Sequence, residues 1–163
     1  MIKRAAVQIF ADDLTIGQVF VGKPRTIGDD QFRLFADITG DDHPIHYDDD
    51  YAAKTRYGKR LAHGLLVMSM TALGATAMSG QIEDAMIAFV EQSARFLKPV
   101  FVGDTLTSRF EIAAIVPKPG RGALVRFGVS LTNDRNEIVL EGHHCYLLKV
   151  KLSSISPGPA DAV

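Results

Sequence analysis

The heptapeptide GDDHPIH, residues 40–46, gathers residue types that often carry out acid–base or metal chemistry. Two aspartates and two histidines lie close together in a chain of 163 residues that has only five histidines. A carboxylate beside an imidazole can orient a water molecule and exchange its proton near neutral pH, where histidine titrates. Asp41 and His46, on either side of Pro44, are the candidates for this role. Their spacing permits both side chains to meet at one water but does not require it.

Two other interpretations of this stretch are open. Its aspartates and histidines could supply ligands to zinc or iron, because both metals accept imidazole and carboxylate. Pro44 restrains the backbone between His43 and His46, so the two rings need not point the same way, and we expect no metal. Alternatively, the stretch is a polar loop after a helix end, where Asp, His and Pro are common. That interpretation leaves His46 unexplained.

Hydrophobic periodicity indicates which elements position this loop. Residues 17–27 alternate loosely, as a strand does, with an expected irregularity at Pro24. Residues 29–39 place apolar side chains on one face of a short helix that Gly40 ends. The three acids at 48–50 precede a second short helix, where carboxylates satisfy free N–H groups and complement the helix dipole. We therefore interpret the triple acid as a helix cap.

A hydrophobic helix and a long sheet are predicted downstream. Residues 65–80, LLVMSMTALGATAMSG, are apolar nearly all round and predict one helix of about four turns at 3.6 residues each. Short turn signals separate four strands that follow, and consecutive strands are predicted to be antiparallel neighbours. The strand ranges are 86–99, 105–116, 124–132 and 138–151. The fold class is therefore α+β, with a curved antiparallel sheet wrapped around a central helix.

The central helix also bears on assembly. A helix that is apolar on every side needs more cover than one sheet provides, so we predict a homodimer. Residues 1–152 form a single predicted domain. The remaining residues, 153–163, have the composition of a C-terminal tail.

The composition excludes several classes of protein. Hydrophobic residues make up 47% and charged residues 23% of the chain, as in a soluble globular domain. With a formal net charge of −1 and interspersed acids and bases, we expect no nucleic-acid or membrane partner. Neither a membrane span nor a secretory signal is recognisable. Cys145 is the single cysteine, so no intrachain disulfide can form and we expect a cytoplasmic protein.

Two stretches, taken in order, resemble a known family. FADITGDDHPIHYDDDYAAKTRYGKRLAHGLLVMSM is followed by RFLKPVFVGDTL. This order closely resembles the MaoC-like family of (R)-specific enoyl-CoA hydratases, which have the hot-dog fold. The resemblance spans residues 14–150. Its specific part is the pattern Asp-x4-His followed by His-Gly at the beginning of the central helix.

The resemblance implies an activity and roles for individual residues. The family's catalytic aspartate and histidine fall on Asp41 and His46, and the glycine whose N–H binds the thioester carbonyl falls on Gly64. Many relatives have asparagine where this chain has His43, so His43 either takes over a water-orienting, substrate-binding role or has none. The implied reaction adds water reversibly across a trans-2-enoyl-CoA thioester. It needs no cofactor or metal, because the conjugated carbonyl accepts the electrons and a preorganised N–H stabilises the charge.

Other residues are assigned to substrate binding or orientation. His63 is interpreted first as an orienting or packed histidine at a helix start, and second as a substrate-binding residue. Three residues of the predicted central helix could border an acyl tunnel, and they are Met68, Ala72 and Ala75. His143 and His144 are adjacent in a strand and must face opposite sides, so neither is assigned to the site.

Three alternative functions share parts of this pattern. A 3-hydroxyacyl-[acyl-carrier-protein] dehydratase would use the same site, and basic side chains do not discriminate because coenzyme A phosphates need the same charges. The basic side chains in question are Arg56, Lys59, Arg60 and Lys98. A hot-dog thioesterase would carry a carboxylate on the central helix, and residues 65–79 contain none. A non-catalytic acyl-CoA-binding domain would not need both Asp41 and His46.

Overall fold

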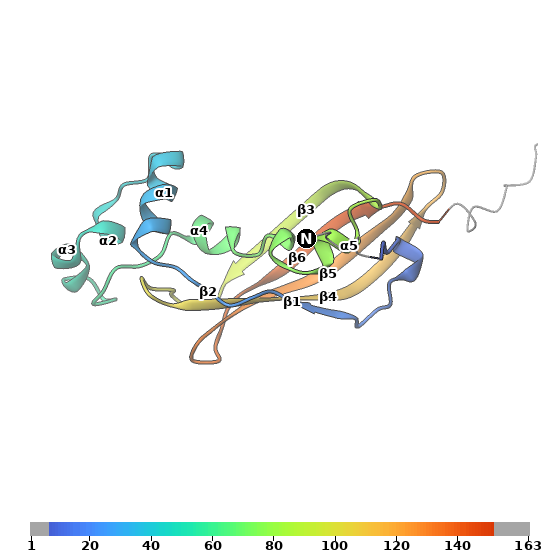
Figure 1. Ribbon diagram of the computed structural model, residues 1–163. Coiled ribbons are helices and arrows are strands. Elements are labelled where there is room, and N and C mark those ends of the chain that lie inside the picture. Colours follow the sequence, from blue (N-terminus) through green and yellow to red (C-terminus); the bar gives the residue numbers. More distant parts are fainter. Residues whose placement is uncertain (1–6, 152–163) are drawn as a thin grey trace, which may run out of the picture.

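A single antiparallel sheet is the largest element of the protein (Figure 1). The computed structural model describes residues 7–151, so the predicted tail at 153–163 lies outside the described residues. The strand order is β1-β4-β5-β6-β3, and β2 also pairs with β4. The strands are β1 (Val19–Val21), β2 (Arg25–Thr26), β3 (Met86–Phe96), β4 (Thr105–Lys118), β5 (Gly122–Asn133) and β6 (Ile138–Leu148). The strand predicted at 17–27 is therefore split into two on either side of Pro24.

The order of the strands departs from the predicted meander at one place. β4, β5 and β6 are consecutive neighbours, as predicted, but β3 pairs with β6 and not with β4. The connection at 97–104 is long enough to span the roughly 14 Å across the two intervening strands. Its backbone finds partners elsewhere, because Ala62 N–H donates to Val100 O and Leu97 N–H donates to Val139 O. β3 consequently lies at an edge of the sheet.

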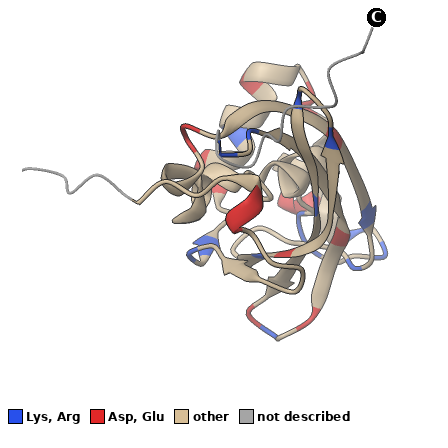
Figure 2. Cartoon of the chain, turned by 90° about the vertical axis from the view of Figure 1, so that its right-hand side faces the viewer, with Lys and Arg blue, Asp and Glu red and all other residues tan. Residues whose placement is uncertain are grey.

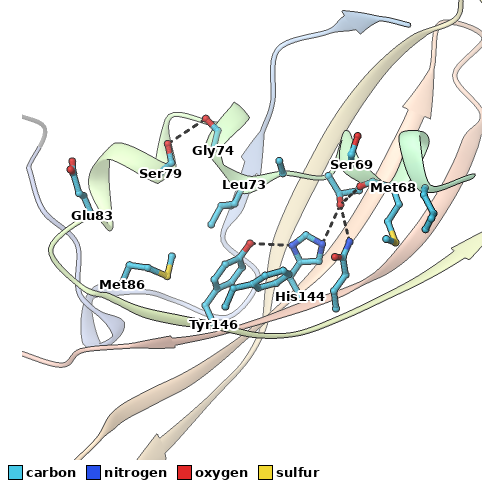
Figure 3. Close-up of a pocket in the computed structure, with 14 residues that line it drawn as sticks. Met68, Ser69, Leu73, Gly74, Ser79, Glu83, Met86, His144 and Tyr146 are labelled. Atoms are coloured by element: carbon cyan, nitrogen blue, oxygen red, sulfur yellow. Dashed lines mark hydrogen bonds between the residues drawn. The ribbon is translucent and has the colours of Figure 1, made fainter. Parts of the chain in front are cut away.

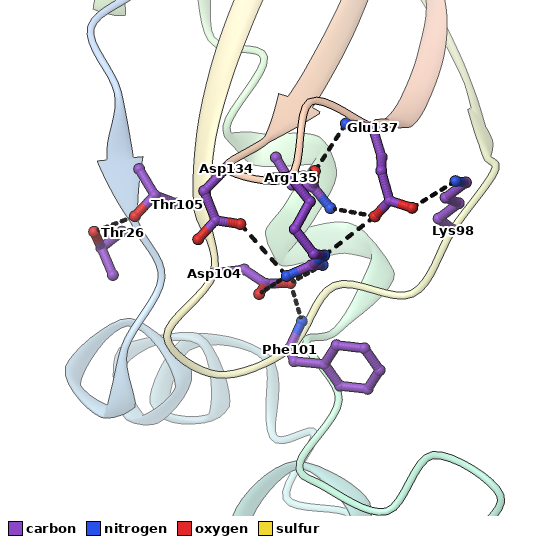
Figure 4. Close-up of polar contacts among 9 residues, drawn as sticks. Thr26, Lys98, Phe101, Asp104, Thr105, Asp134, Arg135 and Glu137 are labelled. Carbon is purple, nitrogen blue, oxygen red and sulfur yellow. Dashed lines mark hydrogen bonds and ion pairs between the residues drawn. The ribbon is translucent and has the colours of Figure 1, made fainter.

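A buried carboxylate holds the end of this connection (Figure 4). Asp104 is 4% exposed and accepts the Phe101 N–H and two nitrogens of Arg135, at 3.0 and 3.3 Å. Arg135 also donates to Glu137, which accepts from Lys98 at 2.7 Å. Burial alone would raise the pKa of Asp104, but the hydrogen bonds from Arg135 and Phe101 hold it below its usual value. The network ties the β3–β4 connection to the turn between β5 and β6.

Three helices that follow β2 in the chain lie together beyond one end of the sheet (Figure 1). They are α1 (Asp29–Thr39), α2 (Pro44–Tyr47) and α3 (Asp49–Ala53), after a short 3-10 helix η1 (Ala11–Asp13). α1 ends at Gly40 with φ 73°, as predicted. Asp48 accepts the Tyr51 N–H at 2.9 Å and caps α3, which confirms the cap predicted for the triple acid. Arg60 pairs with both α1 and α3 through Asp29 and Asp49.

The predicted central helix is broken into three short pieces. They are α4 (Gly64–Ser69), the 3-10 helix η2 (Leu73–Ala75) and α5 (Met78–Gln81). Hydroxyl side chains compete for backbone carbonyls three residues earlier, which offers the chain an alternative to the helix. The pairs are Ser69 with Leu66, Thr71 with Met68 and Thr76 with Leu73. Together with Gly74 and Gly80, which disfavour a helix interior, they explain why the prediction of one four-turn helix was wrong.

Two hydrophobic clusters hold these layers together. One surrounds Phe110 and Phe127 under η2 and α5, and the other joins Phe32 of α1 and Val67 of α4 to the sheet. Leu65 of α4 is 60% exposed, so the sheet does not cover this segment on every side. Figure 2 shows acidic and basic residues dispersed along the chain, over strands, helices and loops. None of the helices within residues 7–151 is long and apolar enough to cross a membrane.

Candidate active site

Helix α2 carries the candidate histidine, and its first turn gives His43 a structural role. The sequence predicted only a polar loop here, but Pro44–Tyr47 form one helical turn. Pro44 occupies the first helical position, where its fixed φ fits and its missing N–H leaves no bond unmade. His43 precedes it as the N-cap, and its Nδ1 accepts the Ile45 N–H at 3.2 Å. His43 is exposed and lines neither of the two cavities beside α4.

His46 is held in one orientation by a backbone carbonyl. Its Nδ1 lies 2.6 Å from Leu61 O. Because a carbonyl oxygen can only accept, Nδ1 carries the hydrogen. In the neutral ring Nε2 is then unprotonated, and it forms no hydrogen bond within residues 7–151. Neutral His46 is therefore ready to accept a proton at Nε2.

His63 stacks against His46 and is almost completely buried. The ring centroids are 3.7 Å apart, and His63 is 3% exposed. His63 Nε2 lies 3.2 Å from Asp41 O, so this nitrogen carries the hydrogen, while the buried Nδ1 has no partner in the described part of the chain. Burial, and then the charge of His46, lower the pKa of His63. A neutral, packed ring of this kind matches the first interpretation of His63.

Tyr47 connects these groups, and sequence reasoning missed it. Its hydroxyl donates to Phe32 O at 2.9 Å and lies 3.1 Å from His63 Nε2 and 3.2 Å from Asp41 O. Burial raises its pKa, and the charges of Asp41 and Asp42 raise it further, so the hydroxyl keeps its proton. Tyr47 thereby fixes the backbone of Asp41 relative to His63. Its position directly after His46 was the only signal in the sequence.

Asp41 completes a compact cluster with the two histidines. A carboxylate oxygen of Asp41 and one ring nitrogen each of His46 and His63 lie within 4.8 Å of one another. The Asp41 carboxylate is exposed and makes no hydrogen bond within residues 7–151. Two groups at such a separation can hold one water between them, since each hydrogen bond spans about 2.8 Å. The same three donors also suit a divalent cation.

Gly64 begins helix α4 directly after this cluster. Its N–H belongs to the first turn and lies outside the intrahelical ladder, so it can donate to a ligand. A Cβ at Gly64 would lie 3.3 Å from the Phe96 ring, so the backbone and this ring are closely packed. A cavity of about 370 Å³ borders Gly64 and is also lined by Arg56 and Lys98. The candidate N–H therefore adjoins an open, positively charged recess.

A larger cavity of about 880 Å³ lies between the broken central segment and the strands β3 and β6 (Figure 3). Met68 and Ala72, which were predicted to border a tunnel, line this cavity, whereas Ala75 does not. Leu65, Leu73, Met86 and Phe89 add apolar side chains to its wall, and Leu65 brings the wall next to Gly64. The large cavity and the recess beside the Gly64 N–H are thus adjacent along α4.

The wall of the large cavity also carries a neutral polar group of side chains (Figure 3). His144 Nε2 lies 3.2 Å from Thr71 Oγ, and His144 Nδ1 lies 3.2 Å from the Tyr146 hydroxyl. Thr71 also accepts from Gln92 at 3.3 Å. Burial lowers the pKa of His144 to about 4 and raises that of Tyr146 to about 12. Neither side chain carries a charge at neutral pH.

Comparisons with known proteins show the family of this chain. The family model described as a MaoC like domain matches residues 12–132. The chain belongs to the MaoC-like family. It is 31% identical over 133 residues to the (R)-specific enoyl-CoA hydratase of Rhodospirillum rubrum, covering 82% of this chain and 87% of that protein. It is 28% identical over 134 residues to the 3-hydroxybutyryl-CoA dehydratase of Methylorubrum extorquens, covering 82% and 80%.

The solved structures confirm the predicted hot-dog fold for this MaoC-like chain. A Mycobacterium tuberculosis protein with a double hotdog fold superposes with a TM-score of 0.74 and 26% identity, over 93% of this chain and 47% of that chain. Hydratases and dehydratases of this family are hydro-lyases, and the present chain is an enzyme of that class.

Proposed function

We propose that this protein is an (R)-specific enoyl-CoA hydratase, equally a 3-hydroxyacyl-CoA dehydratase, in which Asp41 and His46 are the catalytic pair. The observation that carries the proposal is the approach of the Asp41 carboxylate to His46, whose Nε2 is left unprotonated by the Leu61 carbonyl. A base and a carboxylate in this relation suit the activation of one water. The (R) product is taken from the name of the Rhodospirillum rubrum relative, and the trans double bond from the family resemblance.

The mechanism follows from the placement of these groups. In hydration, His46 Nε2 removes a proton from the water held beside Asp41, and the water oxygen bonds to C3 of the enoyl thioester. The electron pair of the C2–C3 double bond moves toward the thioester carbonyl, where the Gly64 N–H stabilises the negative charge. The carbonyl re-forms as the proton that His46 took from the water is relayed through Asp41 to C2, which returns both groups to their starting states. Dehydration is the reverse of these steps.

The two cavities supply places for the rest of the substrate. The large cavity beside Met68 and Ala72 has the apolar walls and the volume that an acyl chain needs. Arg56 and Lys98 beside Gly64 carry the positive charge that the phosphates of coenzyme A need. Arg60 is less suited, because it does not line this recess and is paired with two carboxylates, those of Asp29 and Asp49. Within residues 7–151, Lys98 is paired with Glu137 alone. His43, His63 and Ala75 are not assigned contacts with substrate in this proposal.

A homodimer is part of the proposal. Within residues 7–151, β3 pairs only with β6, which leaves its other edge open. Apolar side chains beside that edge are exposed, among them Phe89 at 52%, Val90 at 55% and Leu65 of α4 at 60%. A second copy pairing edge to edge would cover them and complete the backbone hydrogen bonds of β3. Val90→Lys should yield a monomer in light scattering, and a monomeric, fully active wild type would contradict the proposal.

Hydration of crotonyl-CoA tests the proposed activity directly. Loss of the conjugated thioester's ultraviolet absorbance should be catalysed by the wild type and give the (R)-3-hydroxy product. Asp41→Asn and His46→Gln should each lower kcat/KM at least about a hundredfold. Asp42→Asn is the matched control, because it removes the neighbouring charge outside the cluster, and its activity should stay within a few-fold. Turnover only of acyl-carrier-protein thioesters would instead support the carrier-protein dehydratase.

A further inference from the structure

A second cluster of metal-ligating side chains lies on the outer face of the sheet. Glu91 of β3 and His143 and Cys145 of β6 place a carboxylate oxygen, a ring nitrogen and a sulfur within 4.8 Å of one another. The intervening His144 and the following Tyr146 line the large cavity, so the cluster and the cavity lie on opposite faces of β6. We propose that Glu91, His143 and Cys145 form a zinc site, separate from the hydratase site.

The register of the two strands builds this arrangement. His143 and Cys145 are two positions apart in β6 and therefore share one face. Glu91 is the direct cross-strand neighbour of Cys145, and Ser93 is that of His143. Val90 is the extra residue of a β-bulge in β3. Without the bulge, Val90 would stand opposite Cys145 in place of Glu91. The backbone irregularity thus brings the carboxylate to the thiol and the imidazole.

His143 is already oriented as a metal ligand would be. Its Nε2 lies 2.7 Å from Glu91 Oε1, and its Nδ1 lies 2.7 Å from Ser93 Oγ. Ser93 Oγ is itself held by the His143 backbone N–H at 3.2 Å. Ligating imidazoles usually have the second nitrogen fixed by such a polar group.

The ligand types select zinc among the common cations. Thiolate, imidazole and carboxylate all bind zinc, and donors around a tetrahedral zinc lie about 3.3–3.7 Å apart. Glu91 and His143 need to separate by about 1 Å as the ion replaces the Nε2 hydrogen between them, and Cys145 closes in. Binding releases the thiol proton, and the ring hydrogen moves from Nε2 to Nδ1, which then donates to Ser93 Oγ. The imidazole stays neutral, so the two negative ligands balance the charge of the ion. A water takes the fourth position.

Two neighbours bear on the strength of this site. Cys145 is 6% exposed, so the bound sulfur would be shielded from solvent. Arg126 of β5 stands opposite Cys145 and its charge acts on Glu91. A positive charge beside the ion opposes binding, so Arg126→Gln should strengthen zinc affinity.

Cobalt(II) titration tests the proposal, because the chain has one cysteine. Charge transfer from thiolate to cobalt absorbs in the near ultraviolet and can arise only at Cys145; the carboxylate–histidine cluster of the candidate active site has no sulfur. We expect this band in the wild-type protein, its loss on adding excess zinc, and its absence in Cys145→Ser. Affinity should fall at least 100-fold in His143→Ala and in Glu91→Gln. Ser93→Ala should weaken it about tenfold.

A matched control separates the site from general surface effects. Glu141 lies on the same outer face and is paired with Arg95, so Glu141→Gln should leave cobalt binding unchanged. No charge-transfer band in the folded wild-type protein would overturn the proposal. A band of equal affinity in His143→Ala and Glu91→Gln would reduce the site to a thiol alone and overturn it too. Crotonyl-CoA hydration after chelation, followed in parallel, reports on the hydratase proposal independently.

Discussion

The imidazole rings of His46 and His63 stack, with centroids 3.7 Å apart and an interplanar angle of 24°. Two positive charges at this separation repel each other, and burial together with the charge of His46 lowers the pKa of His63. At most one ring is therefore protonated while the enzyme is active. The relation determines how activity should depend on pH.

Activity should show an acid limb that reports one histidine. Because the pKa of His63 is lowered, that ring is the harder one to protonate, and log kcat/KM should fall with a slope of one where acid first inhibits the enzyme. His63→Phe, which keeps an aromatic ring against His46, should preserve that slope. A slope of two in the wild type would show instead that both rings titrate together.

Removal of the Tyr47 hydroxyl should affect both stability and turnover. Tyr47→Phe leaves the buried His63 Nε2–H with only the 3.2 Å contact to Asp41 O, and Phe32 O loses its donor. We expect a loss of about 1 kcal/mol in the free energy of unfolding and a lower kcat with little change in KM. Urea titration and steady-state kinetics measure the two effects. Tyr51→Phe, which is 42% exposed, is the control and should change neither.

A methyl group at Gly64 should slow the reaction by hindering the approach of the substrate, and not only by displacing the Phe96 ring. Gly64→Ala places a Cβ 3.3 Å from the Phe96 ring and beside the candidate donor N–H. We expect kcat/KM to fall at least about tenfold. Adding Phe96→Leu should restore unfolding stability but not activity. Recovery of activity in the double variant would show that displacement of Phe96 was the cause.

Buried His144 should make the protein less stable in mild acid. Its pKa falls to about 4 from an ordinary value of 6.5, so the unfolded chain binds the proton more readily. The contribution is complete above about pH 6.5 and is lost as the pH falls toward 4, up to about 3 kcal/mol. His144→Gln should therefore lose less stability than the wild type between pH 7 and 4.5 in urea titrations. Equal losses in both proteins would contradict this assignment.

Two aspartates that contact the same arginine should differ greatly in their importance. Asp104 is buried and receives two bonds from Arg135, whereas the Asp134 contact is 3.4 Å long and exposed. Asp104→Asn should cost about 2–3 kcal/mol of unfolding free energy, and Asp134→Asn less than about 0.5 kcal/mol. Comparable losses in thermal and urea unfolding would show that burial is not the deciding factor.

Elements with local signals could be predicted from the sequence. Helix α1 has apolar residues on one face and a glycine stop, and strands β4 to β6 have turn residues between them. The pairing of β3 with β6 had no such signal, because alternation indicates faces and not neighbours. The central segment was misjudged because apolar character does not register hydroxyls such as Thr71 and Thr76, which bind the backbone that a helix would use.

The candidate site also has some features with a sequence signal and others without one. The motif made Asp41 and His46 candidates through the chemistry of their side chains, and the family resemblance added Gly64 as a candidate. The Leu61 carbonyl that sets the tautomer of His46 could not be identified, because a backbone atom has no sequence signature. The capping role of His43 depended on a helical turn that was too short to give a periodic pattern.

The candidate catalytic groups come from one continuous stretch, residues 41–64, whose hydrogen bonds join His46 to Leu61 and His63 to Asp41 within that stretch. The large cavity is walled instead by strands β3 and β6 and by the broken central segment. In the proposed function, reactivity and acyl selectivity therefore depend on separate parts of the chain. We expect substitutions in the strands to alter which acyl groups are accepted without disturbing the proposed water-activating unit.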